Sequence, residues 1–273
     1  MFDHVGIRVS DLEEARRFYE TGVGALGFGE PTRGEHFFEW EDLSIGAAGD
    51  DRPVTRRLHV GLAAPSREHV DEFWRALTTA GFRDDGSPGL RPQYREDYYG
   101  AFVLDPDGNS IEALHHGSLR SDGLLVQHLW VRVRDVDASQ SFYETIAPVV
   151  GIELWQRTPE RVSFGGRGAS CSFVHGERPT ENVHLAFPAP DNATVDEFHR
   201  VAVAAGYEDN GAPGERARYH PGYYGAFVLD PDGNNVEAVC HNRYETGAAG
   251  LGPLRLPPIH STRALRPPDR RAG

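Results

Sequence analysis

The chain has 273 residues, enough for two domains of ordinary size, and with 39% hydrophobic and 25% charged residues its composition is that of a globular protein. A formal net charge of −13 argues against nucleic acid and an anionic membrane surface as partners, because both attract basic proteins. Only Cys171 and Cys240 could form a disulfide, the N-terminal segment is charged, and no long apolar run is present. We therefore expect a cytoplasmic protein.

An internal repeat is the strongest feature of the sequence. The stretch YYGAFVLDPDGN occupies residues 98–109 and recurs letter for letter at residues 223–234. A single offset of this size indicates a duplicated domain, because solenoid repeats are shorter. We predict one domain at 1–118, a second at 124–243, and a flexible tail at 244–273 that is rich in Gly, Pro and Arg.

Each half itself contains two similar modules. In the first, Val5, Ile7 and Val9 alternate as in a half-buried strand, and residues 10–13 form a capping box that predicts a helix start. The second module begins at His59, its helix ends at Gly81, and an Asp-Pro-Asp-Gly-Asn turn joins its last two strands. The sequence predicts an α+β fold: four βαβββ modules, paired into two curved, mostly antiparallel sheets with helices on the outer face.

Strand alternation also sorts the polar residues by face. With Val5, Ile7 and Val9 directed toward the helix, His4 lies on the opposite, open face of its strand, and the same reasoning applies to the equivalent strands. Two imidazoles and one carboxylate in each half would make a facial ligand set that leaves metal positions free for substrate or water. The predicted metal ligands are His4, His59, Glu112, His128, His184 and Glu237.

These strands, with the closing hairpin YYGAFVLDPDGNSIEAL, resemble the vicinal oxygen chelate superfamily, which includes glyoxalases, bleomycin resistance proteins and extradiol dioxygenases. The likeness extends from residue 2 to residue 242. It implies a divalent metal (Fe²⁺, Mn²⁺, Ni²⁺ or Zn²⁺) that captures neighbouring oxygens of a small-molecule substrate. In this family modules often pair across chains, so a monomer acting as a pseudo-dimer, or a homodimer, is expected. Pairing across the halves would join His4 with His184 and Glu237, and His128 with His59 and Glu112.

The resemblance leaves two classes of function open. One is a metal-dependent enzyme of the lyase, isomerase or ring-cleaving dioxygenase type. The other is a metal-independent, antibiotic-binding resistance protein, which is disfavoured because such proteins have generally lost the ligand set. Phe102 and Phe227 stand where ring-cleaving dioxygenases carry a tyrosine, which argues against ordinary catechol cleavage. Residues 43–48 offer no second carboxylate of the kind glyoxalase I uses, which argues against that activity.

The sequence also suggests residues with a catalytic role. Tyr99 and Tyr224 are candidates for donating hydrogen bonds to substrate oxygens. His220 stands where the first half has Arg95, and a histidine near the metal can move a proton at neutral pH whereas arginine stays protonated. We therefore predict two unequal sites, with the catalytic site the one that contains His220.

Overall fold

A computed structural model of the protein describes residues 1–119, 124–166 and 168–242. The predicted tail at 244–273 lies outside the described residues. The first half contains two modules, whose elements are β1 (His4–Val9), α1 (Leu12–Ala25), β2 (Thr32–Arg33), β3 (Phe37–Trp40) and β4 (Leu43–Ala47), then β5 (His59–Ala63), α2 (Arg67–Thr79), β6 (Asp84–Leu90), β7 (Tyr99–Leu104) and β8 (Ser110–His115).

The second half repeats this order. Its elements are β9 (Val126–Val133), α3 (Val136–Val150), β10 (Glu153–Thr158), β11 (Arg161–Gly166) and β12 (Ala169–His175), then β13 (His184–Pro188), α4 (Asn192–Ala204), β14 (Asp209–Glu215), β15 (Tyr224–Leu229) and β16 (Asn235–Cys240). The four-module α+β architecture predicted from the sequence is confirmed.

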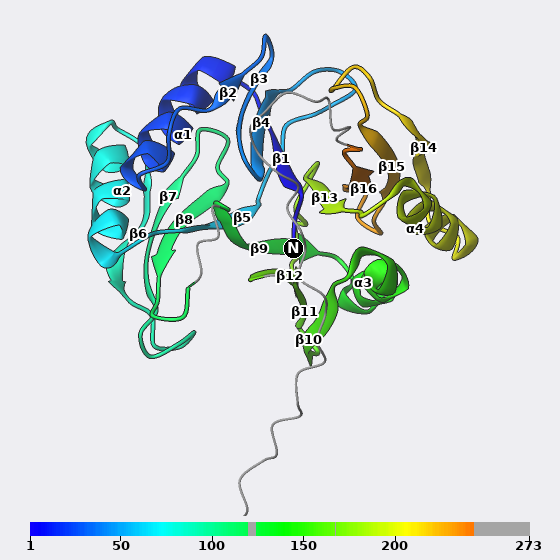
Figure 1. Ribbon diagram of the computed structural model, residues 1–273. Coiled ribbons are helices and arrows are strands. Elements are labelled where there is room, and N and C mark those ends of the chain that lie inside the picture. Colours follow the sequence, from blue (N-terminus) through cyan, green and yellow to red (C-terminus); the bar gives the residue numbers. More distant parts are fainter. Residues whose placement is uncertain (120–123, 167, 243–273) are drawn as a thin grey trace, which may run out of the picture. The chain divides into compact units, whose positions relative to one another are not determined.

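Each of the two sheets is built from both halves of the chain (Figure 1). One eight-stranded sheet has the order β14-β15-β16-β13-β1-β4-β3-β2, and the other has β10-β11-β12-β9-β5-β8-β7-β6. Most strand pairs are antiparallel, as expected, but β1–β4, β5–β8, β9–β12 and β13–β16 are parallel. The first module therefore pairs with the fourth and the second with the third, as the cross-half alternative predicted.

The join between the halves is an antiparallel pair in each sheet. In one sheet β1 runs beside β13, with Gly6 opposite His184, and in the other β5 runs beside β9, with Gly61 opposite His128. Since paired residues on neighbouring strands share a face, these registers bring histidines from different halves close together.

Local signals in the sequence account for the helix starts and the hairpins. The first helix is capped by Asp11, whose side chain accepts from the backbone N–H groups of Glu13 and Glu14, so the cap lies one residue later than the capping box predicted. In the repeated turn, Asp105 accepts from the backbone of Asn109, and Asn109 Oδ1 accepts from Leu58 N at 3.0 Å. This turn therefore ties the closing hairpin to the strand that begins at His59.

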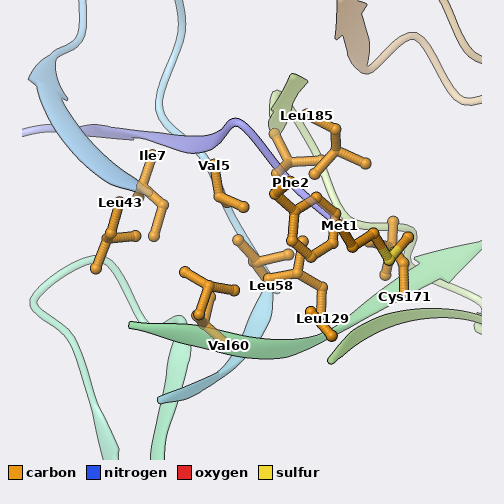
Figure 2. Close-up of a cluster of buried hydrophobic side chains, with 14 of the residues drawn as sticks. Met1, Phe2, Val5, Ile7, Leu43, Leu58, Val60, Leu129, Cys171 and Leu185 are labelled. Atoms are coloured by element: carbon orange, nitrogen blue, oxygen red, sulfur yellow. The ribbon is translucent and has the colours of Figure 1, made fainter. Parts of the chain in front are cut away.

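The apolar faces of the two sheets contribute to one core. Val5 and Ile7 of β1 are fully buried, as alternation predicted, and they lie in a cluster with side chains from the other sheet (Figure 2). The helices pack on this side, with α2 against β7 and α4 against β15. The opposite face of each sheet is thus left for the polar residues. No helix in the described residues is long and apolar enough to cross a membrane.

Candidate metal centres

The six predicted ligands form two clusters in space, each with residues from both halves. In the cluster called here the His59 site, His59 Nε2 lies 3.1 Å from His128 Nε2 and 3.2 Å from Glu112 Oε2. The third edge, from His128 Nε2 to Glu112 Oε2, measures 3.3 Å. Glu112 is 1% exposed, so its carboxylate is held inside the protein beside two imidazoles.

The second cluster, the His4 site, has the same composition. His4 Nε2 lies 3.0 Å from His184 Nε2, and His184 Nε2 lies 3.0 Å from Glu237 Oε2. The remaining distance, from His4 Nε2 to Glu237 Oε2, is 3.8 Å. The two clusters are therefore near copies of each other, in line with the internal duplication.

The three spacings at the His59 site, and two of the three at the His4 site, match a facial set of metal ligands. Bonds of about 2.1 Å would place two ligand atoms about 3.0 Å apart at a right angle and about 3.4 Å apart at the tetrahedral angle. At the His59 site the Nδ1 atom of each histidine has a hydrogen-bond acceptor. His59 Nδ1 faces Ser110 Oγ, and the Ser110 hydroxyl itself donates to Asp85. His128 Nδ1 faces Gln127 Oε1. If each ring carries its proton on Nδ1, the two Nε2 lone pairs face each other and the Glu112 carboxylate. Three electron-rich atoms this close together are the arrangement that binds a cation.

Electrostatics within the His59 site follow from burial and proximity. Burial acts to raise the pKa of Glu112, but the hydrogen bonds and charges of His128 and His59 outweigh it and lower the pKa to about 2. Burial lowers the pKa of His59, more than Glu112 raises it. Both effects favour an ionised Glu112 and a neutral His59, the forms of these side chains that bind metal.

Two glycines make room for the histidine that comes from the other half. A Cβ on Gly61 would lie 2.1 Å from the His128 ring, and a Cβ on Gly6 would lie 3.0 Å from His184. In the first half each of these glycines follows a ligand histidine in the sequence His-Val-Gly. At the equivalent positions the second half has Trp130 in place of Gly6 and Ala186 in place of Gly61. This is a sequence signal for the cross-half contact that strand alternation alone did not reveal.

We expect Gly61→Ala to displace His128 and weaken metal binding at the His59 site selectively. The reason is steric, because a Cβ at 2.1 Å from the ring forces the imidazole or the strand to move. Zn²⁺ titration of the Gly61→Ala chain is the measurement, and Gly6→Ala, with a closest approach of 3.0 Å, is the milder matched change. Normal affinity at both sites in Gly61→Ala would show that the ring is free to move.

The first tyrosine of each Tyr-Tyr-Gly motif supports the carboxylate ligand. Tyr98 Oη donates to Glu112 Oε1 at 2.8 Å, and Tyr223 Oη donates to Glu237 Oε1 at 2.7 Å. Burial, together with the neighbouring Glu112 charge, raises the pKa of Tyr98, so it stays a phenol that can donate. Gly100 leaves space for this contact, since a Cβ there would lie 2.5 Å from Glu112 Oε1.

The prediction that Tyr99 and Tyr224 face the substrate is wrong. Tyr99 Oη donates to Asp71 of α2 and Tyr224 Oη donates to Asp196 of α4, both at 2.8 Å, so both side chains lie on the helix side of their sheets. Their neighbours Tyr98 and Tyr223 lie on the site side because successive strand residues point to opposite faces.

His220 is joined to the His4 site indirectly. Its Nδ1 donates to the carbonyl of Pro221 and its Nε2 lies 2.8 Å from His241 Nδ1, so both ring nitrogens have partners. His241 Nε2 in turn lies 2.9 Å from Asp3 Oδ2, and Asp3 Oδ1 accepts from His4 Nδ1 at 2.9 Å. In the other half, Arg95 pairs with Asp97 and Ser118 instead.

A cavity of about 410 Å³ opens on the His59 site. Its walls include Trp130, Tyr94 and Phe102, and Trp130 lies edge-on to His59 with ring centroids 6.3 Å apart. Phe102 pairs with Glu112 in register and brings no hydroxyl to the position that a dioxygenase tyrosine would occupy. The cavity also includes polar side chains, among them Asp85, Gln127 and Arg132.

Comparison with known proteins agrees with this geometry. A family model described as the Glyoxalase/Bleomycin resistance protein/Dioxygenase superfamily matches residues 1–113 and 125–238. The chain belongs to this superfamily. No match was found among curated proteins. The two matched segments are the repeats seen in the sequence, so the chain is a tandem member of the glyoxalase/bleomycin resistance/dioxygenase superfamily.

Solved structures of the superfamily share the fold over most of the chain. Glyoxalase I from Zea mays superposes with a TM-score of 0.60 at 18% identity, covering 88% of this chain and 92% of that one. A putative dioxygenase from Bacillus subtilis gives a TM-score of 0.57 at 13% identity, covering 87% and 84%. At such identities the likeness concerns the fold, and the chemistry has to be argued from the residues of this superfamily member.

Proposed function

We propose that the protein is a divalent-metal-dependent enzyme that acts on a small oxygenated molecule at the His59 site. The observation that supports this best is a His, His, Glu ligand set with edges of 3.1, 3.2 and 3.3 Å that opens into a cavity of about 410 Å³. A cavity of this size suits a small organic molecule. The reaction type proposed is that of a lyase, an isomerase or a ring-cleaving dioxygenase.

The ligand set is of the kind that leaves open metal positions on one side. Two histidines and one carboxylate suit Fe²⁺, Mn²⁺, Ni²⁺ or Zn²⁺, and a metal held there would act as a Lewis acid toward neighbouring oxygens of the substrate. Tyr98, Ser110 and Gln127 hold the three ligands from behind. Their hydrogen bonds fix the ring orientations and the carboxylate before substrate arrives, which reduces the reorganisation that binding requires.

The cavity walls suggest how substrate is held. Trp130, Phe102 and Tyr94 line the cavity and offer aromatic faces to a planar or apolar part of the substrate. The aromatic lining also favours one alternative function, sequestration of an antibiotic without metal. Chelation separates the two, because sequestration survives removal of the metal and catalysis does not.

Metal analysis of protein purified without oxygen tests the proposal directly. After reconstitution with iron, manganese, nickel or zinc in turn, we expect metal at both ligand clusters, followed by metal-dependent turnover with substrates that carry neighbouring oxygens. Oxygen uptake with a panel of catechols and hydroxyquinones distinguishes a dioxygenase from a lyase or isomerase. Metal content at background after every reconstitution would contradict the proposal.

A further inference from the structure

We infer that Asp3, fixed by His241 and His220, is a positioning group for the His4 ligand, and that this makes the two metal sites unequal. The inference rests on the proposed function in one respect, namely that His4 binds a metal. The four side chains form a continuous line of hydrogen bonds, with distances of 2.9, 2.9 and 2.8 Å from His4 through Asp3 and His241 to His220.

The direction of each hydrogen bond follows from its partner. Each carboxylate oxygen of Asp3 faces one imidazole, Oδ1 toward His4 Nδ1 and Oδ2 toward His241 Nε2, and a carboxylate between two ring nitrogens accepts from both. His4 Nδ1 and His241 Nε2 must therefore carry the protons in their bonds to Asp3. A neutral His4 then leaves its Nε2 lone pair free, and this is the atom that faces His184 and Glu237.

The outer pair holds the His241 ring in place. The carbonyl of Pro221 can only accept, so His220 Nδ1 donates to it, and His220 Nε2 lies 2.8 Å from His241 Nδ1. The two rings are stacked, with centroids 5.1 Å apart. These contacts orient His241 so that its Nε2 faces Asp3, whose side chain is only 17% exposed.

The His59 site has no such arrangement. The equivalent of His4 is His128, whose Nδ1 meets the neutral amide oxygen of Gln127 at 2.6 Å. His116, the counterpart of His241, stacks on Tyr98 and hydrogen-bonds Ser118, and within the described residues it has no bond to Gln127. The nearest carboxylate behind a ligand there is Asp85, which reaches His59 only through the hydroxyl of Ser110.

A carboxylate behind a ligating imidazole fixes its tautomer and raises its basicity, and removing such a partner typically costs about 10-fold to 100-fold in metal affinity. Asp3 does this for His4, while Gln127 fixes His128 without a charge. His4 is therefore the ligand whose orientation and basicity depend on residues far away in sequence, His241 and His220.

The test measures Zn²⁺ affinity at one site at a time by chelator competition in the full chain. Glu112→Ala isolates the His4 site and Glu237→Ala isolates the His59 site. We expect Asp3→Asn to weaken Zn²⁺ binding at the His4 site by about 10-fold to 100-fold, and His241→Ala to weaken it by a smaller factor. Neither change should affect the His59 site.

His116→Ala is the matched control, since His116 and His241 both contact the ring of the tyrosine that holds the Glu ligand. If His116→Ala weakens the His59 site as much as His241→Ala weakens the His4 site, the tyrosine contact is responsible and the inference is wrong. Unchanged affinity in both Asp3→Asn and His241→Ala also overturns it, while leaving the proposed metal function intact.

A second measurement needs no metal. Nitrogen-15 NMR of the histidine rings in metal-free protein should show His4 protonated at Nδ1, with this proton lost or exchanging faster in Asp3→Asn and unchanged in His116→Ala. An Nε2-protonated His4 in the wild-type chain would overturn the inference. If the wild-type chain binds no Zn²⁺, the proposed function fails, and the NMR result still decides the arrangement of the hydrogen bonds.

Discussion

Removing His4 and His184 together is expected to cost the protein one of its two metal ions, whereas removing His4 and His59 together is expected to cost both. The first pair belongs to a single ligand cluster, and the second pair takes one ligand from each. A cluster with only one imidazole and one carboxylate cannot complete a facial set, so its affinity collapses. Elemental analysis of Zn²⁺-loaded, gel-filtered protein gives the count of ions per chain.

The two double variants form a matched pair. Each removes two histidines that begin the first strand of a module, and neither changes a glutamate. If each half of the chain instead built its own site, the results would be exchanged: His4→Ala with His184→Ala would lose both ions and His4→Ala with His59→Ala only one. That outcome would contradict the cross-half arrangement in solution. A count of two ions in both double variants would contradict the ligand assignment itself.

Replacing Trp130 by alanine is expected to lower kcat/KM by about 10-fold to 100-fold, since a buried aromatic face contributes about 1.5–3 kcal/mol of binding. Trp130 lines the cavity of the His59 site and contacts a ligand histidine, so most of the loss should appear as weaker substrate binding. Trp155→Ala is the matched control, because Trp155 is 58% exposed and is not among the residues that line this cavity. Steady-state kinetics with the substrate identified from the panel give the comparison.

The prediction from sequence assigns turnover to the other site and expects a different pattern. If His220 is an acid/base at the His4 site, His220→Ala lowers turnover by about 10²-fold or more while metal is retained, and Arg95→Ala mainly raises the substrate concentration required. That pattern, with Trp130→Ala fully active, would contradict the cavity-based proposal. A loss in His220→Ala that is accompanied by weaker metal binding would instead indicate its positioning role through His241 and Asp3.

Much of the fold and of the ligand set could be predicted because strand alternation is a local property. The period of two in Val5, Ile7 and Val9 placed His4 on the open face, and the same rule placed Glu112 and Glu237. The rule also bears on the tyrosines: Phe102 pairs with Glu112, and counting back from Phe102 in steps of two reaches Gly100 and Tyr98, not Tyr99.

The sequence by itself determined which residues share a face, where the hairpins turn and that the chain is duplicated, because spacing along one strand and turn chemistry are set by neighbouring residues. Only the tertiary structure decided which histidine meets which glutamate, since alternation fixes a face but not the strand that lies alongside. The contact between Asp3 and His241, which are 238 residues apart, was likewise decided only by the tertiary structure. It arises because β1 lies next to β13 in a sheet that brings the two ends of the described chain together. Strand pairing over such a separation depends on the packing of the whole sheet, which no local sequence pattern specifies.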